Sequence, residues 1–225
     1  MSATSPHSVP PPPVAPPPRR VGLGYLRASA PLRRWRTVDL LTAAFLGAAF
    51  GVLYWIWGLA YTAPSAALEA LYRPLGSLTY GPWLLAGVVG GLVVRRPGAA
   101  FLCEVVAALV SMLAGTSWGW ATLLSGALEG LGAELAFAIF GYAAFTMSNA
   151  IFAGALAAPL EAVWELSYYY GWAWPTIHEA VYAIAFIVSG AACGAVAWLV
   201  VRALASSGAL NALPPGQELR EAHAH

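Results

Sequence analysis

The sequence predicts an all-α fold, a polytopic membrane protein in which six transmembrane helices form one bundle. Of the 225 residues, 60% are hydrophobic and 9% are charged, whereas a soluble domain carries about 25% charged residues. The hydrophobic residues gather into long runs, and a run of about 20 apolar residues can cross the hydrocarbon core of a membrane. Most arginines flank these runs. Together these observations exclude a soluble globular domain.

Six apolar segments are candidates for membrane-spanning helices. They cover residues 38–61, 82–94, 97–114, 118–140, 147–169 and 177–203, and the second is short. Pro82 and Pro97 open the second and third segments, where the first turn of a helix tolerates proline. Residues 37–205 are therefore expected to form one membrane domain.

The two ends of the chain differ in composition from this domain. Proline runs at 10–13 and 16–18 precede Arg19 and Arg20, and proline-rich sequence favours an extended chain. Residues 1–36 are expected to be a disordered cytoplasmic arm, because the order of basic and apolar residues does not match a cleavable signal peptide. Residues 206–225 are expected to be a short polar tail.

The positions of arginine predict the orientation. Arginines gather at one side of the predicted topology: Arg33, Arg34, Arg36, Arg95, Arg96 and Arg202. Arg73 lies on the other side. Since cytoplasmic loops are enriched in basic residues, both termini are expected in the cytoplasm of a bacterial cell, with the chain in its plasma membrane. Six spans also require both termini on one side.

The connection between the first two segments is the longest one and has the sequence APSAALEALYRPLGSLT. Loops of this length are often functional. Two interpretations stay open: a lid over the outer mouth of the bundle, or a surface helix whose Leu68, Leu71 and Tyr72 touch the membrane.

Several glutamates lie within the apolar segments, where a carboxylate costs about 2.5–3.5 kcal/mol at the centre of a membrane helix. A helical rise of about 1.5 Å per residue puts Glu129 near the midplane and Glu161 in the outer third. Glu104 and Glu134 come at similar depth on consecutive helices. These carboxylates need partners, a water-filled cavity or a polar ligand.

Aromatic residues are more numerous on the outer side than an interfacial belt, which serves both membrane faces, explains. Four of them are candidates to line a binding site: Trp57, Tyr80, Trp118 and Trp164. Aromatic faces and carboxylates around one cavity suit a flat ring that is cationic or carries an amine. For each ring, membrane contact or packing is the alternative.

Small residues recur at four-residue spacing in the first segment: Ala44, Gly47, Ala48 and Gly51. Such seams let helix backbones approach closely in a membrane. The seam serves either packing within the bundle or docking of a partner subunit.

Enzyme motifs are absent from the sequence. His178 and Glu179 begin HEAVY, but the second His of HExxH is replaced by Tyr182, so zinc protease chemistry is not supported. There is no P-loop and no lysine. We expect no catalytic activity, no cofactor, no metal site and no nucleic-acid partner.

Three stretches resemble the YkoE family. They are RWRTVDLLTAAFLGAAFGVLYWIW at 34–57, the apolar block at 80–140, and VSGAACGAVAWLVVRALASSGAL at 188–210. The resemblance implies the S component of an energy-coupling-factor (ECF) vitamin transporter, which captures thiamine or its hydroxymethylpyrimidine precursor outside. It also implies a transmembrane T component and two cytosolic ATPases as partners, with the seam on the first helix docking the T component.

The resulting hypothesis assigns roles to the candidate residues. The four aromatic residues supply ring faces, and Glu129 and Glu161 meet the amine or the cationic ring. Glu104 and Glu134 either form the floor of the pocket or hold helices together. One alternative is a proton-coupled transporter that works alone through its intramembrane glutamates. Another is a membrane enzyme that uses His178 and Glu179.

Overall fold

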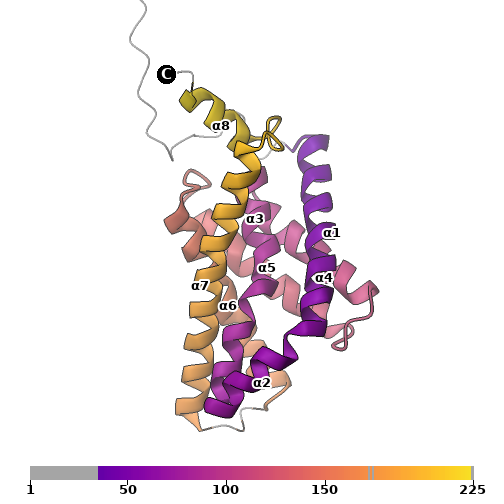
Figure 1. Ribbon diagram of the computed structural model, residues 1–225, viewed down its shortest axis with the longest axis vertical. Helices are drawn as coiled ribbons and strands as arrows, with labels where there is room; N and C mark the ends of the chain where they lie inside the picture. The colour runs from indigo at the N-terminus through magenta and orange to yellow at the C-terminus, as the bar shows by residue number, and fades with distance from the viewer. Residues whose placement is uncertain (1–34, 172, 174, 224–225) are drawn as a thin grey trace, which may run out of the picture.

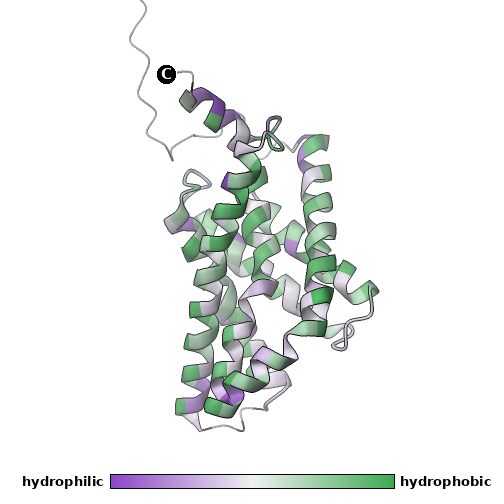
Figure 2. Ribbon diagram, viewed as in Figure 1, coloured by the Kyte–Doolittle hydropathy of each residue, from purple (hydrophilic) through white to green (hydrophobic). Residues whose placement is uncertain are grey.

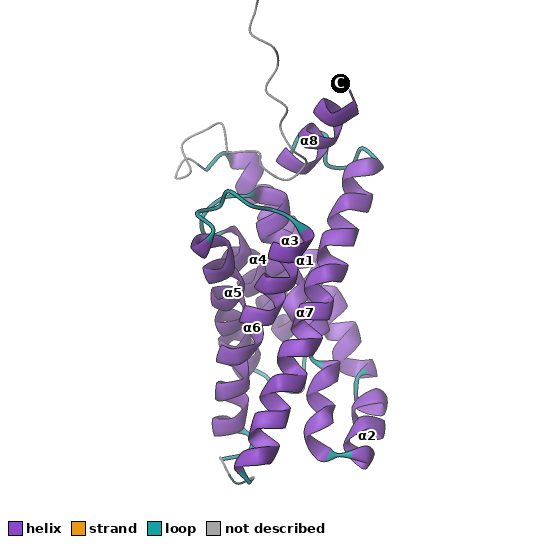
Figure 3. Cartoon of the chain, turned by 90° about the vertical axis from the view of Figure 1, so that its left-hand side faces the viewer, coloured by secondary structure: helices purple, strands orange, loops and turns teal. Residues whose placement is uncertain are grey.

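The computed structural model describes residues 35–171, 173 and 175–223, and these contain helices and no strands (Figures 1 and 3). The helices are α1 (Thr37–Ala60), α2 (Thr62–Leu71), α3 (Leu85–Val94), α4 (Ala99–Leu113), α5 (Ala121–Ile139), α6 (Met147–Tyr168), α7 (Thr176–Ser206) and α8 (Pro214–His223). Two short 3-10 helices, η1 (Arg73–Thr79) and η2 (Gly81–Leu84), lead into α3.

The predicted all-α membrane bundle is confirmed. Five stretches are long and apolar enough to cross a membrane: Thr37–Ala60, Arg73–Val94, Ala121–Ile139, Met147–Tyr168 and Thr176–Ser206. The third predicted segment, 97–114, corresponds to α4, an apolar helix of only 15 residues. Large apolar side chains such as Phe45 and Leu59 lie exposed on the outside, and Figure 2 shows the hydrophobic colouring along α1 and α7. The chain is therefore a multi-pass membrane protein whose outer surface suits lipid.

The helix α3 lies at the centre of the bundle. Nine of its ten residues are buried, and it contacts α1, α4, α5, α6 and α7. We call the two ends of the bundle the α8 end and the α2 end, after the helices found there (Figures 1 and 3). Helices α1 and α7 run from one of these ends toward the other (Figure 1), so residue number gives depth along them.

The long connection between α1 and α3 consists of two different parts. Helix α2 lies at the surface, where the side chain of Leu71 is 78% exposed, as the surface-helix interpretation expects. In η1, by contrast, Ser77 is buried and its hydroxyl donates to the Tyr182 carbonyl oxygen of α7 at 2.8 Å. The 3-10 segment is thus packed into the bundle and lengthens the short second span.

Helices α6 and α7 pack backbone against backbone. A Cβ atom on Gly154 would overlap the carbonyl oxygen of Gly190, and a Cβ atom on Gly190 would overlap that of Gly154. Likewise, a Cβ atom on Gly194 would overlap the carbonyl oxygen of Ala150. Small residues permit this approach, which is how helices associate closely inside a membrane.

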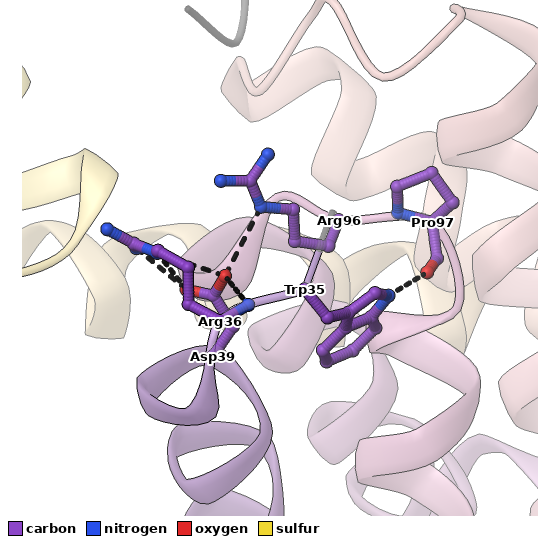
Figure 4. A network of polar contacts seen from close by, with 5 residues as sticks. All are labelled: Trp35, Arg36, Asp39, Arg96 and Pro97. Atoms are coloured by element: carbon purple, nitrogen blue, oxygen red, sulfur yellow. Dashed lines mark hydrogen bonds and ion pairs between the residues drawn. The ribbon is translucent and has the colours of Figure 1, made fainter. Parts of the chain in front are cut away.

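At the α8 end, Asp39 joins the start of α1 to the α3–α4 connection (Figure 4). Its carboxylate is fully buried and accepts from Arg36 at 2.7 Å and from Arg96 at 3.4 Å. The indole nitrogen of Trp35 donates to the Pro97 carbonyl oxygen at 3.2 Å. Because a buried charge is stable only when it is paired, these contacts fix the first turn of α1 against the bundle. Over residues 206–225, where the sequence suggests a polar tail, the structure contains α8.

Candidate functional site

A cavity of about 80 Å³ lies toward the α2 end of the bundle. All five spanning stretches border it, through α1, η2, α5, α6 and α7, and so does the short helix α4. Its lining combines carboxylates, hydroxyls and aromatic rings: Tyr54, Tyr61, Tyr80, Trp83, Ala108, Ser111, Trp118, Thr122, Ser125, Glu129, Glu161, Glu165, Tyr169 and Phe186.

Five of the polar side chains reach the cavity from two neighbouring helices, α5 and α6. Thr122, Ser125 and Glu129 recur at three- and four-residue spacing on α5, so they share one face. Glu161 and Glu165 are one turn apart on α6 and also share a face. Since all five line the same hollow, the two faces point toward each other across it.

Two polar atoms at the cavity are buried without a hydrogen-bond partner, Glu161 Oε2 and Thr122 Oγ1. Glu129 is 6% exposed, and the described residues supply no hydrogen bond to it. Glu165 differs, because the hydroxyl of Tyr182 donates to its Oε2 atom. Buried polar groups are nearly always hydrogen-bonded, so the unpartnered oxygens indicate that a polar ligand or water belongs there.

The lining contains no lysine, arginine or histidine, so the three carboxylates have no basic side chain beside them in the cavity. Proximity between carboxylates is unfavourable while both are ionised. A cation or an amine donor entering the cavity would relieve that repulsion. An anion would be repelled by the same groups.

Aromatic rings form one wall of the cavity. The Trp83 ring lies 5.1 Å from Tyr61 and 5.4 Å from Trp118 between centroids, both within the range of favourable ring pairs. At the mouth, burial raises the pKa of Tyr169 to about 12, and Glu165 and Glu161 add to the shift. Tyr169 therefore stays a neutral hydroxyl that can donate a hydrogen bond.

Of the eight residues predicted to bind substrate, the structure brings four together at the cavity: Tyr80, Trp118, Glu129 and Glu161. Trp57 does not line the cavity but packs against the aromatic wall. Its indole nitrogen donates to the Thr79 carbonyl oxygen at 3.1 Å, and its ring contacts Trp83. Trp164 does not line the cavity and stacks on Tyr168 at 4.5 Å.

Glu134 lies away from the cavity and closes the start of α4. Its carboxylate accepts from the backbone nitrogens of Gly98 at 2.6 Å, Ala100 at 3.0 Å and Phe101 at 3.3 Å. The hydroxyl of Tyr142 also donates to it, and burial together with this bond raises the pKa of Tyr142 above its usual value. A carboxylate at the free N–H groups of a helix start is favourable. The helix-holding alternative fits Glu134.

Glu104 is one layer behind the cavity lining. It is 1% exposed, and its Oε2 atom accepts from the Gly87 backbone nitrogen of α3 at 2.5 Å. Its other oxygen, Oε1, has no partner. Tyr54, which does line the cavity, lies beside it, so Glu104 supports the lining from the second layer and does not form its surface.

Sequence reasoning missed most of the other lining residues. Glu165 follows Glu161 by one turn, and this helical spacing was the available signal. The hydroxyls of Thr122 and Ser125 share the face of Glu129 on α5, so the same periodicity pointed to them. Tyr54 and Phe186 carry no such signal, because an aromatic residue within an apolar run looks like ordinary packing.

The four-residue seam of α1 is divided between two surfaces. Gly47 and Gly51 face α4: a Cβ atom on Gly47 would come within 2.7 Å of the Cys103 carbonyl oxygen, and one on Gly51 within 2.7 Å of that of Ala107. Ala44 is exposed and Ala48 is half-buried. Only the alanines therefore remain on the outer surface of the bundle.

No group of three or more His, Cys, Asp or Glu side chains within the described ranges is arranged to hold a metal ion.

Comparison with known proteins agrees with this architecture. A curated relative from Bacillus subtilis (strain 168), described as a putative HMP/thiamine permease protein YkoE, is 26% identical over 192 residues, which is 84% of this chain and 94% of the relative. A crystal structure of an S component of an ECF transporter superposes with a TM-score of 0.77 at 24% identity and covers 85% of this chain and 96% of its own. The predicted resemblance to YkoE and the S-component fold are thereby confirmed, and these relatives are transport proteins, not enzymes.

The model of one protein family matches residues 38–160, which is more than half of the chain. That family is described as the permease component of ABC-type cobalt transport systems. This chain belongs to the family of ABC-type cobalt transport system permease components.

Proposed function

We propose that this chain is the substrate-binding S component of an ECF importer, and that it captures hydroxymethylpyrimidine (HMP) or thiamine in the cavity at the α2 end. The relative's description as an HMP/thiamine permease motivates the substrate. The observation that carries the proposal is the unpartnered Oε2 atom of buried Glu161, which faces a cavity with two further carboxylates and an aromatic wall.

The chemistry of the lining suits an aminopyrimidine. Its exocyclic amine donates hydrogen bonds, for which Glu161 and Glu129 offer acceptor oxygens, and bonds to a charged acceptor are about twice as strong as neutral ones. Trp83 and Trp118 supply ring faces for a flat heterocycle. The thiazolium of thiamine adds a cation, which aromatic faces and carboxylates both attract.

The orientation follows from the arginines. Arg36, Arg95, Arg96 and Arg202 belong to the α8 end, whereas Arg73 begins η1 at the α2 end. The positive-inside rule then assigns the α8 end and both termini to the cytoplasm and opens the cavity to the outside of the plasma membrane.

The energy for uptake comes from partners. The family description is that of a permease within an ABC-type system, and a chain without a P-loop needs separate ATPases. We assign the transmembrane T component to the outer surface of α1 at Ala44 and Ala48, because small side chains there permit close approach of a second helix. Two cytosolic ATPases complete the complex.

The experiment is a titration of the purified chain with thiamine and, separately, with HMP. Trp83 and Trp118 border the cavity, so binding is expected to quench tryptophan fluorescence. Glu161→Gln keeps the side chain's size but removes its charge, and should weaken binding about tenfold or more, since a hydrogen bond to a charged group contributes about 1.5–3 kcal/mol.

The matched control is Glu69→Gln on α2. Glu69 is exposed at the same end of the bundle and lies outside the cavity, so its affinity should equal that of the wild type. Neither quenching nor calorimetric heat with either ligand would overturn the proposed substrate. Equal weakening by both variants would show that the effect is a general one of charge.

The cluster of Glu129, Glu161 and Glu165 favours one second candidate, a proton-coupled transporter that works without ATPases. Intramembrane carboxylates are the usual parts of proton relays. This candidate predicts that the chain alone, reconstituted in liposomes, accumulates substrate when a pH gradient is imposed. The S-component proposal predicts binding but no such accumulation.

A further inference from the structure

A second cavity, of about 140 Å³, lies at the α8 end and is separate from the one described above. It lies between the C-terminal parts of α3 and α7, the start of α6, and α8. The residues used below are Arg95, Thr146, Trp198, Arg202 and Glu218, all of which line it. The proposed substrate cavity shares none of these residues.

Arg95 is held in the wall of this cavity. It is 8% exposed and adopts the left-handed conformation at the end of α3, with φ of 55°. Its Nε atom donates to the Leu92 carbonyl oxygen at 3.1 Å, and its guanidinium carbon lies 4.6 Å from the centre of the Phe145 ring. A buried guanidinium fixed in this way is a preorganised donor with little side-chain entropy left to lose.

Arg202 brings a second guanidinium to the same cavity from α7. Its guanidinium carbon lies 5.1 Å from the centre of the Trp198 ring, a cation–π contact that orients an otherwise exposed side chain. The start of α6 adds to this positive field, because Thr146 caps that helix and borders the cavity. Helix starts carry a partial positive charge.

In the structure, a carboxylate of the chain itself balances the charge of Arg95. Glu218 of α8 pairs with Arg95, at 2.8 Å between Nη2 and Oε2. Burial nevertheless lowers the pKa of Arg95, and Glu218 only partly opposes that shift. With two guanidiniums and one carboxylate, the charged lining keeps an excess of one positive charge.

We propose that this cavity binds the phosphate group of an anionic ligand, held by Arg95 and Arg202 in competition with the carboxylate of Glu218. Guanidinium groups match phosphate oxygens in geometry and charge. The source is either the headgroup of an anionic lipid in the adjoining leaflet or a small phosphate compound in solution. In both cases the ligand replaces Glu218 at Arg95, and binding is therefore coupled to the position of α8.

The experiment uses the full chain purified in a mild nonionic detergent. Native mass spectrometry with dioleoylphosphatidylglycerol, and with dioleoylphosphatidylcholine as the zwitterionic comparison, measures lipid retention. Isothermal calorimetry with inorganic pyrophosphate tests the soluble source. Tighter retention of phosphatidylglycerol alone supports the lipid source, whereas pyrophosphate heat that depends on Arg202 supports the soluble one.

Two variants are expected to change ligand retention in opposite directions. Arg202→Gln should lower retention about tenfold, because one of the two guanidiniums is lost. Glu218→Gln should raise it several-fold, because the competing carboxylate is gone. The matched control is Arg220→Gln. Arg220 is exposed on α8, the helix that carries Glu218, and does not line the cavity. Retention by this variant should equal that of the wild type.

Replacing Arg95, which is buried, could prevent folding. The test therefore uses Arg202, whose side chain is exposed and whose replacement should leave the fold intact. Equal retention of the two lipids together with no pyrophosphate binding would overturn the proposal. It would also be overturned by a Glu218→Gln protein that binds no better than the wild type. A failure of vitamin binding at the other cavity would leave these outcomes unaffected.

Discussion

Replacing Glu134 by alanine tests the assignment of this glutamate to helix capping and not to substrate binding. The change removes three hydrogen bonds from backbone nitrogens at the start of α4 and one from the Tyr142 hydroxyl. The carboxylate would be lost, while the four donors would remain at a partly buried position.

The magnitude follows from these contacts. A single hydrogen bond to a charged group contributes about 1.5–3 kcal/mol, and a helix cap contributes about 0.5–2 kcal/mol. Water can reach part of this site, since Phe101 is 39% exposed, so the contributions do not add in full. We expect a loss of about 3 kcal/mol in the free energy of unfolding, which is about a hundredfold in the equilibrium constant.

Unfolding in mixed micelles by a denaturing detergent, followed by far-UV circular dichroism, measures this loss. Glu134→Gln keeps one carbonyl acceptor and should lose about 1–2 kcal/mol. Affinity for the vitamin ligand should stay at the wild-type value in Glu134→Gln, because Glu134 does not line the cavity. An alanine variant as stable as the wild type, or a glutamine variant that no longer binds, would refute the reasoning.

Two further perturbations act on other contacts of the bundle. Asp39→Asn leaves Arg96 buried without its counter-charge, so thermal unfolding should show a loss of about 3–5 kcal/mol, and a second change, Arg96→Gln, should recover part of it. Gly190→Ala places a methyl group against the backbone of Gly154, where neither side can give way, and should cost at least about 1–3 kcal/mol by the same measurement. Wild-type stability in either single variant would contradict the packing described above.

The five spanning stretches and the shorter apolar helix α4 were predictable because apolar length and flanking arginines are properties of the sequence alone. The positions of Glu161 and Glu134 along the axes of their helices also follow from the sequence, since helical rise is constant. The direction in which each carboxylate points was not. Rotation about a helix axis depends on which neighbours pack against it, and α5 turns Glu129 toward the cavity and Glu134 toward α4.

The seam of α1 shows a similar limit. Spacing of small residues indicates that a close contact exists, but not with which helix. Gly47 and Gly51 pack against α4, whereas Ala44 is exposed on the outer surface of the bundle. The sequence did not decide the fold of residues 62–79 for another reason. A 3-10 segment such as η1 has no apolar periodicity that distinguishes it from a loop.

The backbone contact between Gly154 and Gly190 bears on how a ligand gets in and out. Gly132 of α5 also approaches a backbone closely, since a Cβ atom there would come within 2.6 Å of Ala157 on α6. These close backbone contacts join α5 to α6 and α6 to α7, so sliding of α6 along either neighbour would lose packing at those glycines. The connection that carries Trp118 lacks such backbone contacts, because Gly115 and Gly119 flank it with left-handed backbone angles and have no other atoms within 4 Å of an added Cβ.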